Sequence, residues 1–433
     1  MSSPYKTVAL HTFGCKANFA DTSLLNSTFD KKGFNVVPFE SIADIYIINT
    51  CSVTDNANKK CRRFIKKIKR RVPQSIIGVT GCYAQLKPDE IIDIPEVNFV
   101  VGMHDKFNFI DKIDDITSSD KLVFHSNDIR SIDSTFLSYS IDERTRSFVK
   151  VQDGCDYACT YCTIPIARGK SRSVSIDKVV KHIKKLDKNN IKEIILSGIN
   201  VGDFGHENNE SFADLLNAIN ESTNIPRIRI SSIEPNLITD EIIDFISQNS
   251  KFMPHLHIPL QSGSDKILKM MRRKYDVSTY ASKISKISST IKDCTIGVDV
   301  MVGFPGESEQ DFNDTYNLLH DLPVSYFHVF PFSERENTVA ARLKNTVPLD
   351  ERYARAKILR KLSKIKFHNI LQKNIGLKRP VLFEMSDEEY ISGLSDNYIR
   401  VKVQKNDIIK HNSVYDISLQ SIRDDQIIGE LIQ

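Results

Sequence analysis

The sequence predicts an α/β protein in three parts: an open parallel α/β domain, a full or partial (β/α) barrel, and a small antiparallel β-barrel. Two long stretches alternate β-branched runs with helical patterns, which is typical of βαβ units and parallel sheets. The remainder contains only short strand-like runs joined by polar turns. The chain has 433 residues, of which 40% are apolar and 26% charged, so about three packed domains are expected.

Residues 1–140 form the first predicted domain. Its strand-like runs are YKTVALHTFG, ADIYIINTCS, SIIGVTGCYA and NFVVGM, and helical patterns such as DTSLLNSTFDKKG lie between them. This alternation predicts a parallel sheet. Residues 111–145 are polar and irregular, so we expect a linker there.

Residues 141–374 form the second predicted domain. Its six strand-like runs are SFVKVQ, KEIILSG, RIRISS, HLHIPL, TIGVDVMVGF and YFHVFPF, each separated from the next by a helical segment. This order predicts a full or partial barrel whose functional residues gather at the C-terminal ends of the strands. Residues 350–374 predict a basic amphipathic helix at the end of the domain.

Residues 375–433 form the third predicted domain, with the runs RPVLFEM, EYISGLS, NYIRVKVQ, SVYDISLQ and QIIGELIQ. A small barrel of the oligonucleotide-binding type fits this pattern. From Leu377 onward the chain has ten acidic and seven basic residues, so this domain is not predicted to be cationic overall.

The N-terminal stretch MSSPYKTVALHTFGC lacks the pattern of a signal peptide, and no apolar run reaches the length of a membrane span. We therefore expect a cytoplasmic protein without a membrane partner. Thiols stay reduced in that compartment, so the eight cysteines indicate metal ligands or catalysts before disulfides.

Three cysteines lie in the loop GCDYACTYC, directly after the first predicted barrel strand: Cys155, Cys159 and Cys162. Three thiolates can hold three corners of an iron–sulfur cubane and leave one iron open for a substrate or cofactor. The alternative is a zinc site whose fourth ligand is remote in sequence, with His255 or His257 as candidates.

A second set of three cysteines is dispersed, but Cys15, Cys51 and Cys82 each end a predicted parallel strand. Loops at the carboxyl ends of parallel strands converge, so these thiols predict a second three-ligand site. Gly14 and Gly81 precede two of the cysteines, which suits a sharp turn at a crowded site. The alternative is three unrelated buried cysteines.

The loop at 155–162, with the aromatic Tyr161 before its third cysteine, resembles the signature CxxxCxΦC of the radical S-adenosylmethionine (SAM) superfamily. The resemblance implies a 4Fe-4S cluster on Cys155, Cys159 and Cys162 whose open iron binds SAM. Reductive cleavage of SAM then yields a 5′-deoxyadenosyl radical.

The stretches GCKAN, NTCSVTDNA and GCYAQLKPDE, followed by this loop, resemble the radical SAM methylthiotransferases over nearly the whole chain. The resemblance implies an N-terminal cluster-binding domain, a radical SAM barrel and a C-terminal TRAM domain. It also implies a second 4Fe-4S cluster on Cys15, Cys51 and Cys82, so that all six cysteines are catalytic. One SAM would donate a methyl group and another the radical, with a low-potential electron donor and a sulfur source as partners.

Within that family, GCKANFADTS and INTCSVTDNANKKCR resemble the branch that modifies carbon 2 of threonylcarbamoyl-adenosine, next to the anticodon of tRNA. This implies the tRNA anticodon stem-loop as substrate. Alternatives are a methylthiotransferase for isopentenyl-adenosine in tRNA or for a ribosomal-protein aspartate, or a non-catalytic iron–sulfur RNA-binding or sensor protein.

The ends of the barrel strands carry SGIN, SSIEP, PLQSGSD and DVMVGFPGE, which by position should surround SAM. The candidate cofactor-binding residues are Tyr161, Gly198, Asn200, Ser232, Glu234 and Gln261.

The stretch KKCRRFIKKIKRR, residues 59–71, has nine basic residues and no acidic one. On a helix it would present a cationic face suited to RNA phosphates, although a solvated face is the alternative. The candidate RNA-binding residues are Arg62, Arg63, Lys66, Lys67, Arg70, Arg168 and Arg172.

Smaller features complete the predictions. In the C-terminal domain, Tyr390, Tyr398, Lys402 and Lys405 could form a local basic–aromatic patch. Cys61 could be a fourth cluster ligand or a sulfur relay, but an ordinary helix thiol is the favoured interpretation. Cys294 is predicted to belong to the core.

Overall fold

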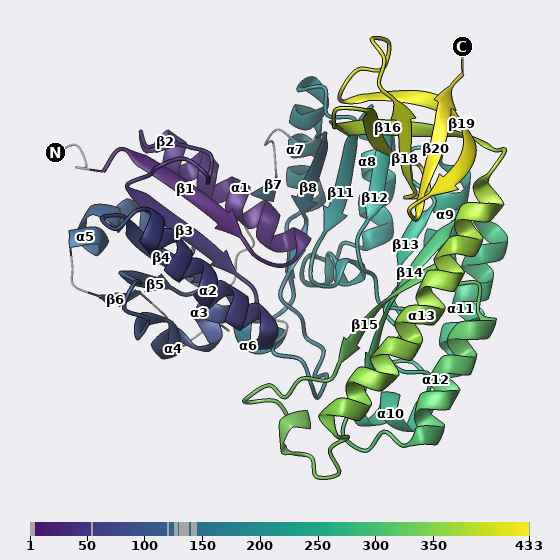
Figure 1. Ribbon diagram of the computed structural model, residues 1–433, viewed down its shortest axis with the longest axis horizontal. Coiled ribbons are helices and arrows are strands. Elements are labelled where there is room, and N and C mark those ends of the chain that lie inside the picture. Colours follow the sequence, from purple (N-terminus) through teal and green to yellow (C-terminus); the bar gives the residue numbers. More distant parts are fainter. Residues whose placement is uncertain are drawn as a thin grey trace.

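The computed structural model describes residues 5–52, 55–118, 121–124, 129, 138–139 and 145–432. Figure 1 shows an α/β region at the N-terminal end, a larger region of strands flanked by helices, and a β-barrel at the C-terminal end. Together with the sheet pairings, this confirms the predicted α/β fold class and the closed terminal barrel. Among the helices of these residue ranges, none is long and apolar enough to cross a membrane.

The N-terminal region is a parallel sheet of six strands in the order β2-β1-β3-β4-β5-β6. Its elements are β1 (Thr7–Thr12), α1 (Lys16–Lys31), β2 (Asn35–Val36), β3 (Ile45–Thr50), α2 (Asp55–Arg71), β4 (Ile76–Gly81), α3 (Cys82–Leu86), α4 (Pro88–Ile92), β5 (Phe99–Val101), η1 (Phe109–Lys112), α5 (Ile113–Ser118) and β6 (Leu122–Phe124). Four of the six strands match the predicted runs. The sequence did not predict β2, which has two residues, or β6, which lies in a stretch dominated by polar residues.

Both faces of this sheet are covered, because the side chains of β3 alternate between two hydrophobic clusters. Ile45 and Ile47 pack with the residues of α1 and α5, whereas Tyr46 and Ile48 pack with the residues of α2. Burial on both faces explains why β3 reads as a continuous apolar run in the sequence.

The expectation of an irregular linker over residues 111–145 is wrong in part. The segment contains α5, which packs against the N-terminal sheet, and β6, which is the last strand of that sheet. It also contains β7 (Ser138–Tyr139), which pairs antiparallel with the first barrel strand. Polar residues dominate this stretch, but Ile113 and Ile116 suffice to bury one face of α5. Residues 119–120, 125–128, 130–137 and 140–144 lie outside the described part of the chain.

The six predicted barrel strands are present: β8 (Arg146–Lys150), β11 (Glu193–Ser197), β12 (Arg227–Ile230), β13 (His255–His257), β14 (Thr295–Val302) and β15 (Tyr326–Pro331). Parallel pairing links β8, β11 and β12, and likewise β13, β14 and β15. Single bridges from Ile228 to Phe252 and from Ser232 to His257 join the two halves into one curved sheet.

Helices cover the outside of this curved sheet (Figure 1): α7 (Ile176–Lys188), α8 (Phe212–Ser222), α9 (Asp240–Gln248), α10 (Asp265–Met270), α11 (Val277–Thr290), α12 (Glu309–Asp321) and α13 (Leu349–Asn374). The last of these matches the predicted helix over 350–374. The loop after β8 contains β9 (Gln152–Asp153), α6 (Ile164–Arg168) and β10 (Arg172–Ser173), with β9 and β10 paired antiparallel.

The C-terminal barrel closes in the strand order β16-β17-β18-β20-β19. Its strands are β16 (Lys378–Ser386), β17 (Tyr390–Ser395), β18 (Arg400–Gln404), β19 (Ser413–Arg423) and β20 (Gln426–Leu431). It docks through buried arginines, since Arg227 donates to the carbonyls of Leu394 and Ser395, each at 3.0 Å. Glu193 holds Arg227 and Arg229 in place with ion pairs of 2.8 and 2.9 Å.

A buried ionic network joins the N-terminal sheet to the partial barrel. The carboxylate of Asp21, on α1, accepts from Lys106 at 2.8 Å and from Lys150, on β8, at 2.5 Å. Asp153 in turn pairs with Lys150 at 3.0 Å and with Arg168, on α6, at 2.7 Å. All five side chains are 4% exposed or less, so this interface depends on complete charge pairing.

We predict that Asp21→Asn destabilises the contact between the two regions by about 3–5 kcal/mol, because it leaves buried cations without their carboxylate. Thermal unfolding and limited proteolysis at the domain junction would measure the loss. The matched control is Asp240→Asn, which removes an exposed pair with Lys283 and should leave both readouts unchanged. Equal behaviour of the two variants would contradict the prediction.

Candidate active site

The three dispersed cysteines lie at the carboxyl ends of neighbouring strands, as predicted. Cys15 caps the N-terminus of α1 just after β1, Cys51 follows β3, and Cys82 begins α3 directly after β4. Because β1, β3 and β4 are adjacent in the sheet, their ends bring the three thiols to one edge.

Two glycines make this convergence possible. Gly14 has a φ of +105°, and a Cβ atom there would lie 2.4 Å from the Cβ and 2.7 Å from the Sγ of Cys51. Gly81 has a φ of +98°, and its Cβ would lie 2.4 Å from the carbonyl oxygen of Thr50. Any side chain at either position would therefore push the cysteines apart.

The second triad lies in the loop between β9 and α6. Backbone N–H groups of Tyr157 and Ile164 donate to the sulfurs of Cys155 and Cys162, both at 3.4 Å. Burial raises the pKa of both thiols to about 12. These thiols therefore need a cationic metal centre to become thiolates, while the N–H groups stabilise the negative sulfur once it forms.

The three dispersed cysteines and one cysteine of the loop triad line the same cavity, of about 240 Å³. Cys15, Cys51 and Cys82 line one side, and Cys162 lines the other. The remaining wall is mostly apolar, with polar groups at a few points; it includes Tyr161, Ile164, Met301, Phe330, Phe332, Gln261, Asp299, Arg168 and Arg335. Sites far apart in the sequence are thus brought face to face.

The sulfurs of neither triad lie as close together as a single zinc ion would hold them. Tetrahedral zinc–sulfur bonds of about 2.3 Å place sulfurs roughly 4 Å apart. Among the described residues, the only three ligand atoms found within 4.8 Å of one another belong to His257, Asp299 and His328. His255, the other candidate zinc ligand, bonds Tyr326 at 2.8 Å instead.

Arg168 and Arg172 do not form an RNA-binding surface, and the prediction for these two residues is wrong. Arg168 is fully buried, pairs with Asp153, and donates to the sulfur of Cys82 at 3.4 Å. Arg172 is 5% exposed and donates to the carbonyl of Arg168 at 2.7 Å. Ion pairs with Asp153 bury both arginine side chains, and Asp21 is a further partner of Arg168. The stretch ARGKSRS alone does not predict these ion pairs.

Arg273 is a site residue that the sequence did not indicate. It donates to the sulfur of Cys159 and to the hydroxyl of Tyr161, both at 3.3 Å, and it pairs with Glu234. Tyr161 is packed edge-on against Phe304 and lines the cavity. Glu234 is therefore committed to Arg273, whereas the sequence predicts that it binds the cofactor directly.

Gln152 is a second residue that the sequence did not indicate. Its side-chain oxygen accepts from the backbone N–H groups of Ile199 and Asn200, both at 2.9 Å. Gly198 permits this contact, because a Cβ there would lie 2.8 Å from that same oxygen. The Asn200 side chain is buried, and both its polar atoms lack a hydrogen-bond partner among the described residues, as a ligand-binding group would.

The other two cofactor candidates also lie at strand ends. Ser232 bridges to His257 just beyond β12. Gln261 has a φ of +68°, bridges to Val300, and lines the shared cavity. Of the six candidates, Tyr161 and Gln261 face this cavity, and the others lie at neighbouring strand ends.

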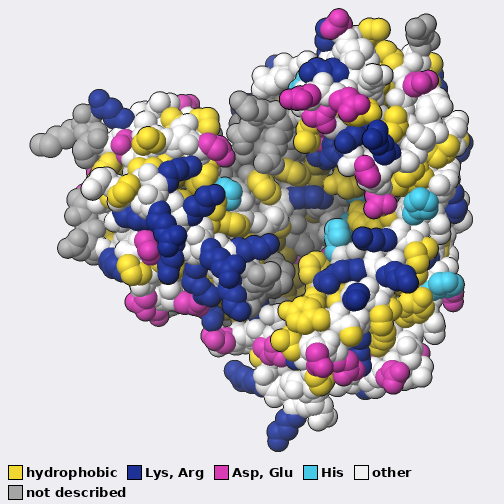
Figure 2. All heavy atoms as spheres, viewed as in Figure 1, with side chains coloured by type: hydrophobic (Ala, Val, Ile, Leu, Met, Phe, Trp, Pro, Cys, Tyr) yellow, Lys and Arg dark blue, Asp and Glu magenta, His cyan; other side chains and the backbone are white. Residues whose placement is uncertain are grey.

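The basic stretch forms the outer face of α2, and Figure 2 shows Lys and Arg side chains gathered over that part of the N-terminal region. Ile65 and Ile68 are buried beneath it. The exposed basic residues of this helix are Lys59, Lys60, Arg63, Lys66, Lys67, Arg70 and Arg71. Arg62 is only half-buried and is paired with Glu90. Cys61 faces the core, where burial raises its pKa to about 12.

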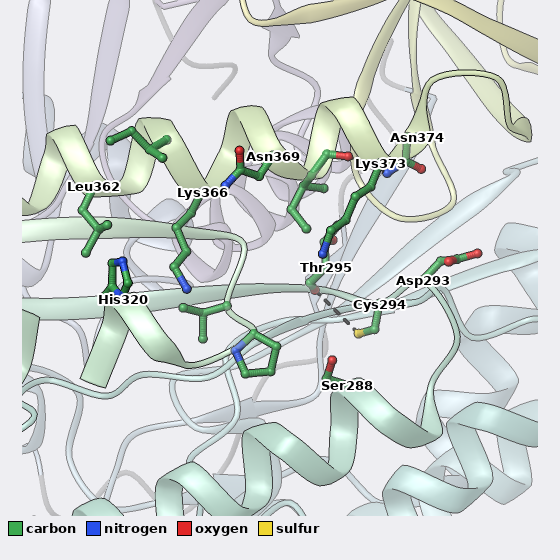
Figure 3. Close-up of a pocket in the computed structure, with 14 residues that line it drawn as sticks. Ser288, Asp293, Cys294, Thr295, His320, Leu362, Lys366, Asn369, Lys373 and Asn374 are labelled. Atoms are coloured by element: carbon green, nitrogen blue, oxygen red, sulfur yellow. Dashed lines mark hydrogen bonds between the residues drawn. The ribbon is translucent and has the colours of Figure 1, made fainter. Parts of the chain in front are cut away.

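Two further features lie away from the cavity. Tyr398 stacks on His255 with ring centroids 4.1 Å apart, so it belongs to the docking interface and not to an RNA patch with Tyr390. Cys294 directly precedes β14, whereas Asp299 and Met301, further along the same strand, line the shared cavity. Cys294 instead borders a separate pocket between α11 and α13, which is drawn in Figure 3. It is half-buried against the core rather than inside it.

Charged groups line the interior of the partial barrel. Asp299 accepts from His257 at 3.1 Å and from His328 at 3.2 Å, which hold the pKa of its carboxyl well below the usual value despite burial. Lys16, the residue after Cys15, faces charged groups of the partial barrel. Burial, with Arg146 and Arg229 nearby, lowers the pKa of its ammonium to about 8.

Two family models match parts of the chain. Residues 7–102 match the model described as uncharacterized protein family UPF0004, and residues 149–319 match the radical SAM superfamily. A solved radical SAM methyltransferase, TsrM from Kitasatospora setae, shares the fold with a TM-score of 0.58 over 75% of this chain and 72% of that one, at 12% identity.

Curated relatives are considerably more similar. The threonylcarbamoyladenosine tRNA methylthiotransferase MtaB of Bacillus subtilis is 38% identical over 91% of this chain and 90% of its own length. That of Aquifex aeolicus is also 38% identical, over 91% and 96%. A tRNA-2-methylthio-N(6)-dimethylallyladenosine synthase of Clostridium botulinum is 35% identical over 80% and 79%. With this identity along nearly its whole length, the chain belongs to the radical SAM tRNA methylthiotransferase family.

Proposed function

We propose that this protein inserts a methylthio group at carbon 2 of threonylcarbamoyl-adenosine beside the tRNA anticodon, using one SAM as methyl donor and a second as radical source. The observation that carries the proposal is the shared cavity, which Cys15, Cys51 and Cys82 line together with Cys162 of the second triad. Relatives named for threonylcarbamoyladenosine match about nine tenths of the chain, against four fifths for those named for dimethylallyladenosine. This difference favours the first acceptor.

Two 4Fe-4S clusters are the proposed working parts, one on Cys15, Cys51 and Cys82 and the other on Cys155, Cys159 and Cys162. When bound, they would supply the electron for cleavage of SAM and an open iron for the sulfur to be transferred. The chain itself holds the ligands in place. Arg168 and Arg273 each donate a charge-assisted hydrogen bond to a cysteine sulfur, which stabilises that thiolate.

For SAM, the strand-end groups around Asn200, Ser232 and Gln261 are the proposed contacts, with Tyr161 and Gly198 beside them. The buried hydroxyls of Ser197 and Ser231 are unpaired among the described residues. Ser197 ends β11, which Asn200 follows, and Ser231 follows the neighbouring strand β12. Glu234 has a positioning role in this proposal, because its carboxylate orients Arg273.

For tRNA, the exposed cations of α2 are the proposed phosphate-binding surface, since the helix carries no acidic side chain between Lys59 and Arg71. A low-potential electron donor and a sulfur source are further proposed partners. Because its proposed substrate is tRNA, the proposed location of the enzyme is the cytoplasm.

The acceptor can be tested with reconstituted enzyme and two anticodon stem-loop RNAs, one carrying threonylcarbamoyl-adenosine and the other isopentenyl-adenosine. We expect methylthiolated product from the first, detected by mass spectrometry of its nucleosides. Product from the isopentenyl RNA alone would refute the proposed acceptor. If fully loaded protein releases no 5′-deoxyadenosine on reduction with SAM, a non-catalytic RNA-binding or sensor role would be favoured.

We predict about eight irons per chain in the loaded protein and about four in either Cys51→Ser or Cys159→Ser, because each variant loses a ligand of one cluster. Cys51→Ser should still release 5′-deoxyadenosine, whereas Cys159→Ser should not. Cys294→Ser serves as the matched control and should keep about eight irons. An undiminished iron content in Cys51→Ser would remove the second cluster site.

We predict that Lys66→Ala combined with Arg70→Ala weakens tRNA binding and lowers the slope of log affinity against log salt by about two, since two phosphate contacts are lost. Binding would be measured anaerobically by filter retention at several salt concentrations. Lys184→Ala with Lys185→Ala, on the exposed face of α7, removes the same charge and should leave the slope unchanged. An unchanged slope in the first variant would place the RNA elsewhere.

A further inference from the structure

Lys16 is a cation of the N-terminal region that faces charged groups of the partial barrel. It is the first residue of α1 and directly follows Cys15. The charged groups that act on its ammonium come from four different barrel strands: Arg146 on β8, Glu193 on β11, Arg229 on β12 and Asp299 on β14. The ammonium is therefore within electrostatic range of charged groups on four barrel strands, and the residue itself directly follows a proposed cluster ligand.

Neither nearby carboxylate is available to this ammonium. Glu193 is shared by Arg227 and Arg229 at 2.8 and 2.9 Å. Asp299 is shared by His257 and His328 at 3.1 and 3.2 Å. Within the described residues, Lys16 makes no ion pair of 4.0 Å or less and no hydrogen bond from its side chain.

Among the described residues, Lys16 is therefore the cation of this group that has no carboxylate of its own. Arg146 is paired with Glu384 and Arg229 with Glu193. An unpaired ammonium in a partly desolvated interior is unfavourable, and an anionic ligand would remove that cost. The route to solvent is short, because Lys16 is only half-buried and Asp299 also lines the shared cavity.

The substituent on N6 of threonylcarbamoyl-adenosine ends in a carboxylate, whereas the isopentenyl group is an uncharged hydrocarbon. We infer that Lys16 binds this carboxylate when the adenine lies in the cavity, and that it thereby selects the acceptor nucleoside. The inference rests on the proposed function, whose acceptor it explains. Arg146 and Arg229 do not compete for the ligand, since the first is paired with Glu384 and the second with Glu193.

The test compares the affinity of the loaded enzyme for two anticodon stem-loops, one with threonylcarbamoyl-adenosine and one with its methyl ester, which lacks the negative charge. Wild-type protein should prefer the free acid by about tenfold or more, as expected for a charge-assisted hydrogen bond. Lys16→Gln should bind both RNAs equally, and Lys16→Arg should keep the preference. Lys31→Gln, at the exposed far end of α1, is the control and should behave as wild type.

Preparations are compared at equal iron content, so that loss of a cluster does not imitate loss of the contact. An undiminished preference for the free acid in Lys16→Gln would overturn the inference. So would an equal loss of affinity for SAM in that variant, because the lysine would then serve the carboxylate of the cofactor. Wild-type enzyme that methylthiolates only the isopentenyl RNA would refute the proposed function itself, a result seen without any variant.

Discussion

The buried ionic network around Asp21 is the interaction on which the site depends. Its members come from both sides of the junction: Asp21 and Lys106 from the N-terminal region, and Lys150, Asp153 and Arg168 from the partial barrel. A buried charge that loses its partner is costly, so the network favours the relative position of the two regions in which every partner is in place. In that position the loop with Cys162 faces the ends of the strands that carry the other three cysteines.

Arg168 connects this structural role to the chemistry. One nitrogen of its guanidinium pairs with Asp153, a second lies 2.5 Å from the amide oxygen of Asn18, and the third donates to the sulfur of Cys82. The same side chain therefore fixes the junction and stabilises a thiolate of the proposed second cluster. Arg273 has the corresponding position beside Cys159. Each triad thus has one buried arginine, and both arginines are held by carboxylates.

The sequence predicted the features that follow from local pattern and sheet geometry. Strand periodicity located β1, β3 and β4, and the convergence of parallel strand ends then brought Cys15, Cys51 and Cys82 together. Contacts between distant segments could not be predicted this way. Arg168 looks like a surface cation in ARGKSRS, yet ion pairs with Asp153 and Asp21 bury it. Gln152 and Arg273 acquire their roles only from neighbours far along the chain, and β6 lies in a polar stretch that hides its apolar residues.

Electron paramagnetic resonance of the reduced enzyme can show whether the two proposed clusters lie on either side of the cavity that Cys15, Cys51, Cys82 and Cys162 line. Two reduced clusters across a cavity of about 240 Å³ should couple through their spins. The spectrum of the fully loaded protein should then be split or broadened relative to the sum of the spectra of two single-cluster variants, Cys51→Ser and Cys159→Ser. A spectrum equal to that sum, at an iron content that shows both clusters present, would contradict the account.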